Sequence, residues 1–119
     1  MWPFKKKLTQ DEIFRNLEEA KDHLEKCKNF LSAKYIDKFD SLELRQEHLE
    51  LVLYYVIAAR QNLRRVGDKR LRYQIDNLEY LTKNFKEADT LDQVRYYLRE
   101  TRKLVDEILS TLNIKLKAE

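Results

Sequence analysis

Apolar residues recur along most of the chain at alternating intervals of three and four positions, which is the spacing of amphipathic α-helices. The first segment shows the pattern at Ile13, Leu17, Ala20, Leu24, Cys27 and Leu31. The same spacing returns in three later segments, which begin near residues 42, 71 and 94. The pattern predicts helices near 9–35, 41–66, 69–86 and 91–114.

Residues suited to helix capping stand at the predicted helix starts. At three of them, a side-chain oxygen can accept a hydrogen bond from a backbone N–H of the first turn. An acid or amide three positions later can then accept a hydrogen bond from the backbone N–H of the capping residue. These pairs are Thr9 with Glu12, Asp40 with Glu43, and Thr90 with Gln93. The fourth start is expected at Asp68, because Gly67 before it suits the left-handed position that ends a helix.

Short connections between the predicted helices favour antiparallel neighbours. We therefore predict an all-α, up-down-up-down four-helix bundle over 9–114, with a basic and aromatic tail at 1–8 and a C-terminal tail at 115–119. The helix over 41–66 is apolar on more than one face through 51–59, so we expect it to be the most buried. An alternative is one continuous helix through Gly67, which would form a long hairpin that dimerises.

Composition agrees with a helical, single-domain protein. The 119 residues include one glycine and one proline, and 38% of them are charged. With one glycine, a Gly-rich phosphate loop is excluded, and the lone Cys27 excludes an intrachain disulfide and favours a reduced, cytoplasmic setting. No apolar stretch follows the first lysines, so we expect no secretory signal. No apolar run in the chain approaches the length of a membrane span, so we expect none.

Candidate catalytic and metal-ligating residues are few and isolated. His23 and Cys27 stand four apart on one predicted helix, but two ligands do not make a zinc site, and Cys27 belongs to the apolar stripe. His48 lies between Glu47 and Glu50 without the H-E-x-x-H spacing of a metalloprotease. We expect no catalytic residues, no metal and no cofactor, since no nucleophile, base and orienting group occur together.

Positive charge is concentrated at one end of the predicted bundle. The formal net charge is +3, whereas the segments expected at that end, 1–20, 55–73 and 103–119, hold 13 basic and 8 acidic residues. Six cations surround the predicted turn, with only Asp68 opposing them: Arg60, Arg64, Arg65, Lys69, Arg70 and Arg72. Because arginine presents a planar fork of donors to phosphate oxygens, these six residues are the predicted nucleic-acid-binding site.

A helix macrodipole offers a simpler explanation for part of this cluster. It accounts for Arg64 and Arg65 at the end of one helix, but not for the three cations that begin the next. Nearby Tyr73 has two interpretations, stacking on a base or, more commonly, packing at the rim of the bundle.

A second basic stripe occupies one face of the last predicted helix, at Arg95, Arg99 and Arg102. Three acidic residues stand near these arginines: Asp92, Glu100 and Asp106. We interpret the stripe as intrahelical ion pairing.

Four features between residues 49 and 112 resemble a known family. Ile57-Ala58-Ala59-Arg60 closes an apolar helix, an arginine-rich turn follows, a short helix carries 78–83, and Leu104-Val105-Asp106-Glu107-Ile108 ends the last helix. This layout resembles the four-helix accessory proteins of diversity-generating retroelements, which are related to bundles encoded in 23S rRNA intervening sequences. The resemblance implies no enzymatic activity, a ring-like homo-oligomer, and association with a reverse transcriptase and its RNA. The family's basic turn would map onto Arg60 and its neighbours.

Three functional classes follow from these patterns. We prefer a non-enzymatic accessory protein that binds RNA or DNA, or a nucleoprotein complex, through the basic turn. The alternative is a protein-interaction adaptor that uses an open flank beside the short third helix or the arginine stripe of the fourth. The third is a bundle attached to a membrane surface by Trp2, Phe4 and the lysines after them. Because this segment is so short, the attachment would be weak.

Overall fold

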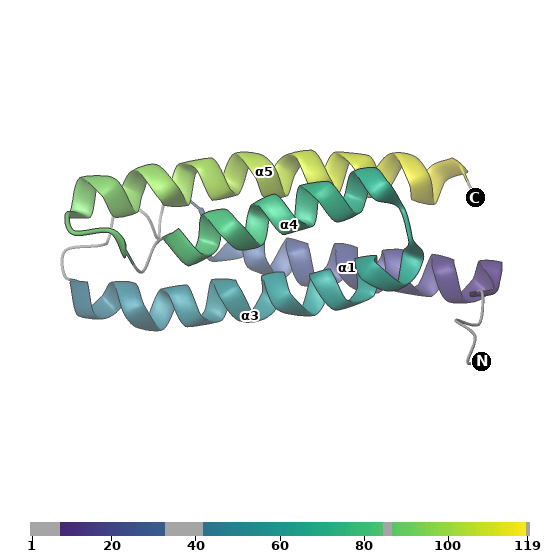
Figure 1. Cartoon of the computed structure of the whole chain (residues 1–119), viewed down its shortest axis with the longest axis horizontal. Coiled ribbons are helices and arrows are strands. Elements are labelled where there is room, and N and C mark those ends of the chain that lie inside the picture. The colour runs from purple at the N-terminus through teal and green to yellow at the C-terminus, as the bar shows by residue number, and fades with distance from the viewer. Residues whose placement is uncertain (1–7, 33–41, 85–86, 119) are drawn as a thin grey trace, which may run out of the picture.

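A computed structural model describes residues 8–32, 42–84 and 87–118, with the backbone alone for 42–46. The helices within these ranges are α1 (Gln10–Asn29), α3 (Leu42–Val66), α4 (Lys69–Asn84) and α5 (Leu91–Ala118). Each helix packs antiparallel to the next, and α5 also packs against α1 and closes the bundle (Figure 1). The predicted up-down-up-down four-helix bundle is confirmed. No described helix has both the length and the apolar character needed to span a membrane.

Two of the predicted capping boxes are present. The Glu12 amide donates to Thr9 Oγ1 at 3.2 Å, and the Thr9 amide donates to Glu12 Oε1 at 3.3 Å. At the start of α5, the Gln93 amide donates to Thr90 Oγ1 at 3.1 Å, and Gln93 Oε1 accepts from the Thr90 amide at 3.3 Å. The third predicted pair, Asp40 with Glu43, lies outside what is described.

Gly67 separates α3 from α4. Its φ of +77° is the left-handed conformation that side chains disfavour, and Asp68 Oδ1 then accepts from the Leu71 amide at 2.9 Å to cap α4. The alternative of one helix running through Gly67 is therefore wrong. The start of α1, this turn and the end of α5 share one end of the bundle, as predicted (Figure 1).

Two helix ends differ from prediction. α1 was expected to reach residue 35 but ends at Asn29, where Phe30 and Leu31 donate to carbonyls three positions back and tighten the last turn. The Phe30 ring then stacks on Tyr55, with ring centres 5.9 Å apart. α5 continues to Ala118, so residues 115–118, expected as a tail, are helical because Leu116 packs against the core.

The core is mainly apolar, but it also contains buried polar residues, among them a contact between α1 and α3. Buried Leu, Val, Ile and Ala side chains from all four helices form it, at the positions that the three- and four-residue spacing predicted. Buried Asn62 donates through Nδ2 to Asn16 Oδ1 at 3.0 Å and to Glu19 Oε2 at 2.8 Å. Asn16 in turn donates to the Glu12 carbonyl at 2.9 Å, so the amides of Asn16 and Asn62 both have hydrogen-bond partners.

The second apolar face predicted for 51–59 is not buried within the chain. Leu51 is 45% exposed, Tyr54 66% and Ile57 38%, all on α3. A helix at the corner of a four-helix bundle buries one stripe against its neighbours and leaves its outer side to solvent. The outer side of α3 through 51–59 is therefore exposed, although the helix is extensively buried on its inner side.

Candidate nucleic-acid interface at the α3–α4 turn

The turn brings five exposed cations together. Arg64 and Arg65 lie in the last turn of α3, and Lys69, Arg70 and Arg72 lie in the first turn of α4. Only Gly67 and Asp68 separate the two helices. None of the five makes an ion pair with a residue that the structure describes. These five residues are called the turn cations below.

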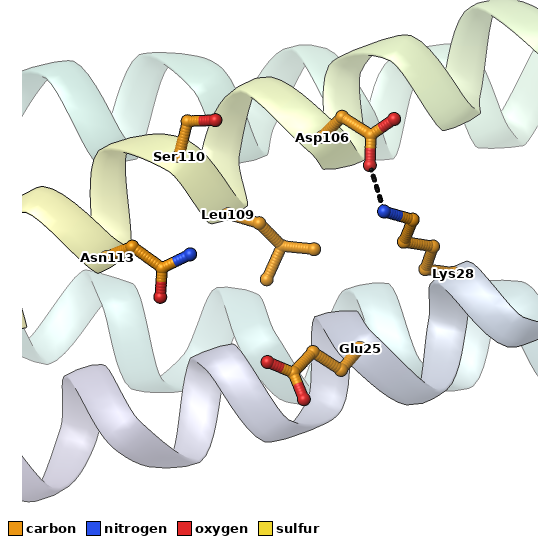
Figure 2. A pocket seen from close by; sticks show the side chains of 6 residues that line it. All are labelled: Glu25, Lys28, Asp106, Leu109, Ser110 and Asn113. Carbon is orange, nitrogen blue, oxygen red and sulfur yellow. Dashed lines mark ion pairs between the residues drawn. The ribbon is translucent and has the colours of Figure 1, made fainter.

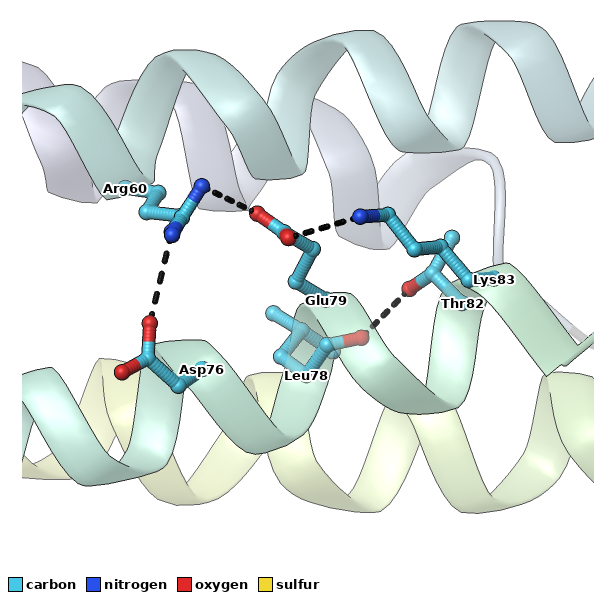
Figure 3. Close-up of polar contacts among 6 residues, drawn as sticks. All are labelled: Arg60, Asp76, Leu78, Glu79, Thr82 and Lys83. Carbon is cyan, nitrogen blue, oxygen red and sulfur yellow. Dashed lines mark hydrogen bonds and ion pairs between the residues drawn. The ribbon is translucent and has the colours of Figure 1, made fainter.

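Arg60 stands apart from the turn cations. Its side chain is 27% exposed and lies between α3 and α4, where Nε donates to Asp76 Oδ1 at 3.3 Å. Its NH1 nitrogen is 2.8 Å from Glu79 Oε2, and the other oxygen of Glu79 pairs with Lys83 at 3.0 Å (Figure 3). Arg60 was predicted as part of the binding site, but the structure places its guanidinium between α3 and α4, in ion pairs with acidic residues of α4.

Asp68 does not neutralise the turn cations. One of its oxygens caps α4, and the other pairs with Lys115 of α5. Burial alone would raise the pKa of Asp68, but hydrogen bonds from Lys115 and from the α4 backbone outweigh it and hold the pKa below its usual value. The Asp68 carboxylate therefore forms its ion pair with α5 and not with the turn cations.

The turn cations of α4 lie where the helix dipole disfavours them. The first turn of α4 contains no acidic residue, although the amino end of a helix carries partial positive charge. Cations at this position cost stability, on the order of a few tenths of a kcal/mol each. Helix stability therefore does not explain Lys69, Arg70 and Arg72.

Tyr73 projects from the same surface. Its side chain is 70% exposed, so it does not pack at the rim of the core as the commoner interpretation had it. Tyr73 follows Lys69 by four positions, which places the two side chains on one side of α4. An aromatic face therefore stands beside a cation with room for a ligand.

α1 and α5 bring charges of both signs to this end of the bundle, since the first turn of α1 also holds exposed Asp11 and Glu12. Arg15 near the start of α1 and Lys117 near the end of α5 are both exposed. The ends of these helices lie beside the α3–α4 turn in Figure 1. The prediction that three distant segments meet at one end of the bundle is confirmed for the residues whose positions are described.

The arginine stripe on α5 is paired only in part. Arg95 NH1 lies 3.6 Å from Asp92, as the ion-pair interpretation requires. The other two acids have different partners, since Glu100 pairs with Lys103 at 3.2 Å and Asp106 with Lys28 of α1 at 2.8 Å. Arg99 and Arg102 make no ion pair with any described residue, so the prediction of intrahelical pairing is wrong for them.

Cys27 and His48 both lie in the interior of the bundle. Cys27 is fully buried, and burial raises the pKa of its thiol to about 12, which keeps it protonated and unreactive. Burial lowers the pKa of His48, partly offset by a hydrogen bond with the Phe30 backbone. Within the described ranges, no three His, Cys, Asp or Glu side chains are grouped to hold a metal ion.

An open groove between α1 and α5 was not predicted from the sequence. It encloses about 450 Å³, and the Lys28–Asp106 ion pair crosses one end of it (Figure 2). Its other lining residues are Glu25, Leu109, Ser110 and Asn113. The i, i+3 and i+4 spacing along α5 could have indicated a shared face, but not that α1 lies opposite. The groove has neither a nucleophile–base pair nor a concentration of one charge.

Comparison with known proteins leaves the site to be interpreted from its own geometry. No family model matches the chain, and neither the search of curated proteins nor the search of solved structures gave a match.

Proposed function

We propose that this protein is a non-enzymatic accessory bundle that binds nucleic acid, alone or within a nucleoprotein complex, through the α3–α4 turn. One observation carries the proposal: two helices present five exposed cations without ion-pair partners among the described residues, joined by a turn of two residues. A phosphate backbone is the ligand that such a cluster complements, because each neutralised phosphate releases counterions.

The surface chemistry favours flexible, single-stranded nucleic acid. Arginine and lysine contact phosphates whatever the sequence, and an exposed aromatic ring stacks on an unpaired base. Tyr73 beside Lys69 supplies such a ring. The resemblance to retroelement accessory proteins adds a specific candidate partner, a reverse transcriptase with its RNA.

Binding to fluorescent RNA and DNA strands tests the proposal. Wild-type affinity is expected to fall as salt rises, with a slope of about 0.7 per phosphate contact on single strands. Arg70→Gln with Arg72→Gln should weaken binding and reduce that slope. A matched variant, Arg99→Gln with Arg102→Gln, removes the same charge from α5 and should bind like the wild type.

Two results would contradict the proposal. One is a wild type that shows no salt-dependent binding at about 50 mM salt, where electrostatic affinity is high. The other is an equal loss of affinity in the two double variants, which would make binding a property of net charge alone. Circular dichroism of each variant serves as the control that its helices are kept.

A protein-interaction adaptor is the second candidate. Its support is the outward side of α4, the shortest described helix, where Tyr73 and Tyr80 stand seven positions apart and are both exposed. Exposed aromatic side chains are enriched in protein interfaces. A complex with a protein partner that survives nuclease and high salt would favour this function over nucleic-acid binding.

A further inference from the structure

The outer side of α3 forms a continuous surface with an apolar centre and two oppositely charged ends. Its centre consists of Leu51, Tyr54 and Ile57, the exposed apolar residues described above. Toward the start of α3 the same side carries exposed Glu47 and Glu50, and toward its end it carries exposed Arg64 and Arg65. This surface is called the α3 outer face below.

The charges at the two ends of the face have no ion-pair partners among the residues that the structure describes. Glu47 and Glu50 make no ion pair with any residue in the described ranges, and neither do Arg64 and Arg65. Isolated exposed hydrophobic residues are ordinary, but an apolar strip framed by unpaired charges is typical of an interaction surface.

We propose that the α3 outer face binds a second copy of itself, with the two α3 helices antiparallel. A two-fold interface requires a surface that complements itself, and this face does so in one direction only. In the antiparallel arrangement, the acidic end of each copy meets the basic end of the other. The parallel arrangement would oppose acid to acid and arginine to arginine.

The spacing along α3 gives the register. Glu50, Ile57 and Arg64 follow one another at intervals of seven, so they lie on one line along the helix, about 10.5 Å between neighbours. A two-fold axis beside Ile57 therefore sets Ile57 against its own copy and Glu50 against Arg64 of the second copy. Tyr54 lies within one turn of this axis and adds an aromatic contact near the centre.

This inference does not rest on nucleic-acid binding. The dimer uses Arg64 and Arg65 at the end of α3, whereas Lys69, Arg70 and Arg72 lie on α4, outside the α3 outer face. The two surfaces therefore have separate test residues. Arg70→Gln with Arg72→Gln should leave dimerisation unchanged even where it weakens binding to RNA.

Sedimentation velocity of the full chain, from about 1 to 200 μM, tests the dimer over the range of moderate affinities. The wild type is expected to move from monomer to dimer as concentration rises. Glu50→Arg alone and Arg64→Glu alone should each raise the dissociation constant at least about tenfold. The variant that carries both changes regains the opposite charges and should return to within about threefold of the wild type.

A charge reversal elsewhere provides the control. Glu107 is exposed on α5 and makes no ion pair within the described structure, so Glu107→Arg should dimerise like the wild type. Three outcomes would overturn the inference: a wild type that stays monomeric, a stable assembly of another size, or a double variant that remains as weak as the single ones. A wild-type monomer that binds a different protein through Tyr54 would assign the face to that partner instead.

Discussion

Asp68 and Lys115 connect the α3–α4 turn to the last turns of α5. The Lys115 ammonium pairs with one oxygen of the Asp68 carboxylate, while the other oxygen accepts the Leu71 amide. A single side chain thus starts α4 and holds the C-terminal part of α5 against the turn. The contact also separates the negative charge of Asp68 from the arginines that flank it in sequence.

Two substitutions of Asp68 are expected to separate its roles. Asp68→Asn keeps a capping oxygen and loses the ion pair, whereas Asp68→Ala loses both. The alanine variant should be less stable than the asparagine variant by about 1 kcal/mol, measured by urea unfolding at neutral pH. Equal stabilities would show that the cap contributes nothing.

Replacement of Gly67 is expected to cost stability through the backbone alone. A Cβ at this position would meet no atom within 4 Å, but the φ of +77° disfavours any side chain. Gly67→Ala should lower the free energy of unfolding by about 1 kcal/mol, and Gly67→Asn by less, because asparagine tolerates this conformation. The urea midpoint at constant m-value measures both. An unchanged midpoint for the alanine variant would mean that the turn relaxes to another conformation.

Arg60 and Arg70 are expected to behave in opposite ways. Arg60→Gln removes the ion pairs with Asp76 and Glu79 and should reduce stability by up to about 1 kcal/mol, because the site is partly exposed. Arg60→Gln should change RNA affinity by less than about twofold, because the Arg60 guanidinium already pairs with Asp76 and Glu79 and is not available to a phosphate. Arg70→Gln should weaken RNA binding without loss of stability. Parallel unfolding and binding curves for the two variants check this, and a large loss of affinity in Arg60→Gln would return Arg60 to the interface.

His48 is expected to make stability fall on acidification. Burial lowers the pKa of His48 in the folded state, so the unfolded chain takes up a proton first as the pH drops below 6.5. The contribution of the neutral ring is present above that pH and is lost as the pH falls toward the folded-state pKa. Urea unfolding between about pH 7.5 and pH 5.5 should show this slope, and His48→Gln should reduce it. His23→Gln is the control, and a slope that persists unchanged in His48→Gln would assign the effect to other groups.

The sequence predicted features that depend on neighbours along one helix. The three- and four-residue spacing located the buried stripes, and the caps at Thr9, Asp68 and Thr90 located three helix starts, because both depend on residues within a few positions. It could not predict how each helix is rotated against the next. Only that rotation shows that Arg60 faces α4, where Glu79 lies, while the five turn cations face solvent.

The same limit explains the other differences. Residues 51–59 are apolar around much of α3, and their composition does not distinguish a buried face from one left to solvent. The acids near the arginine stripe were assigned to partners within α5, but Asp106 faces Lys28 of α1. A contact between residues 78 positions apart in sequence follows from helix packing and leaves no local signal.

The buried hydrogen bond between Asn16 and Asn62 also affects the charged end of the bundle, because it fixes the position of α1 along α3. Apolar stripes alone would tolerate a slide of α1 along α3 by one heptad, about 10.5 Å, since leucines would again face leucines. The slide would strand two amides without partners in the core, at a cost of about 1–3 kcal/mol for each unsatisfied group. Two neutral amides thus hold the start of α1 level with the α3–α4 turn, although neither amide belongs to the turn.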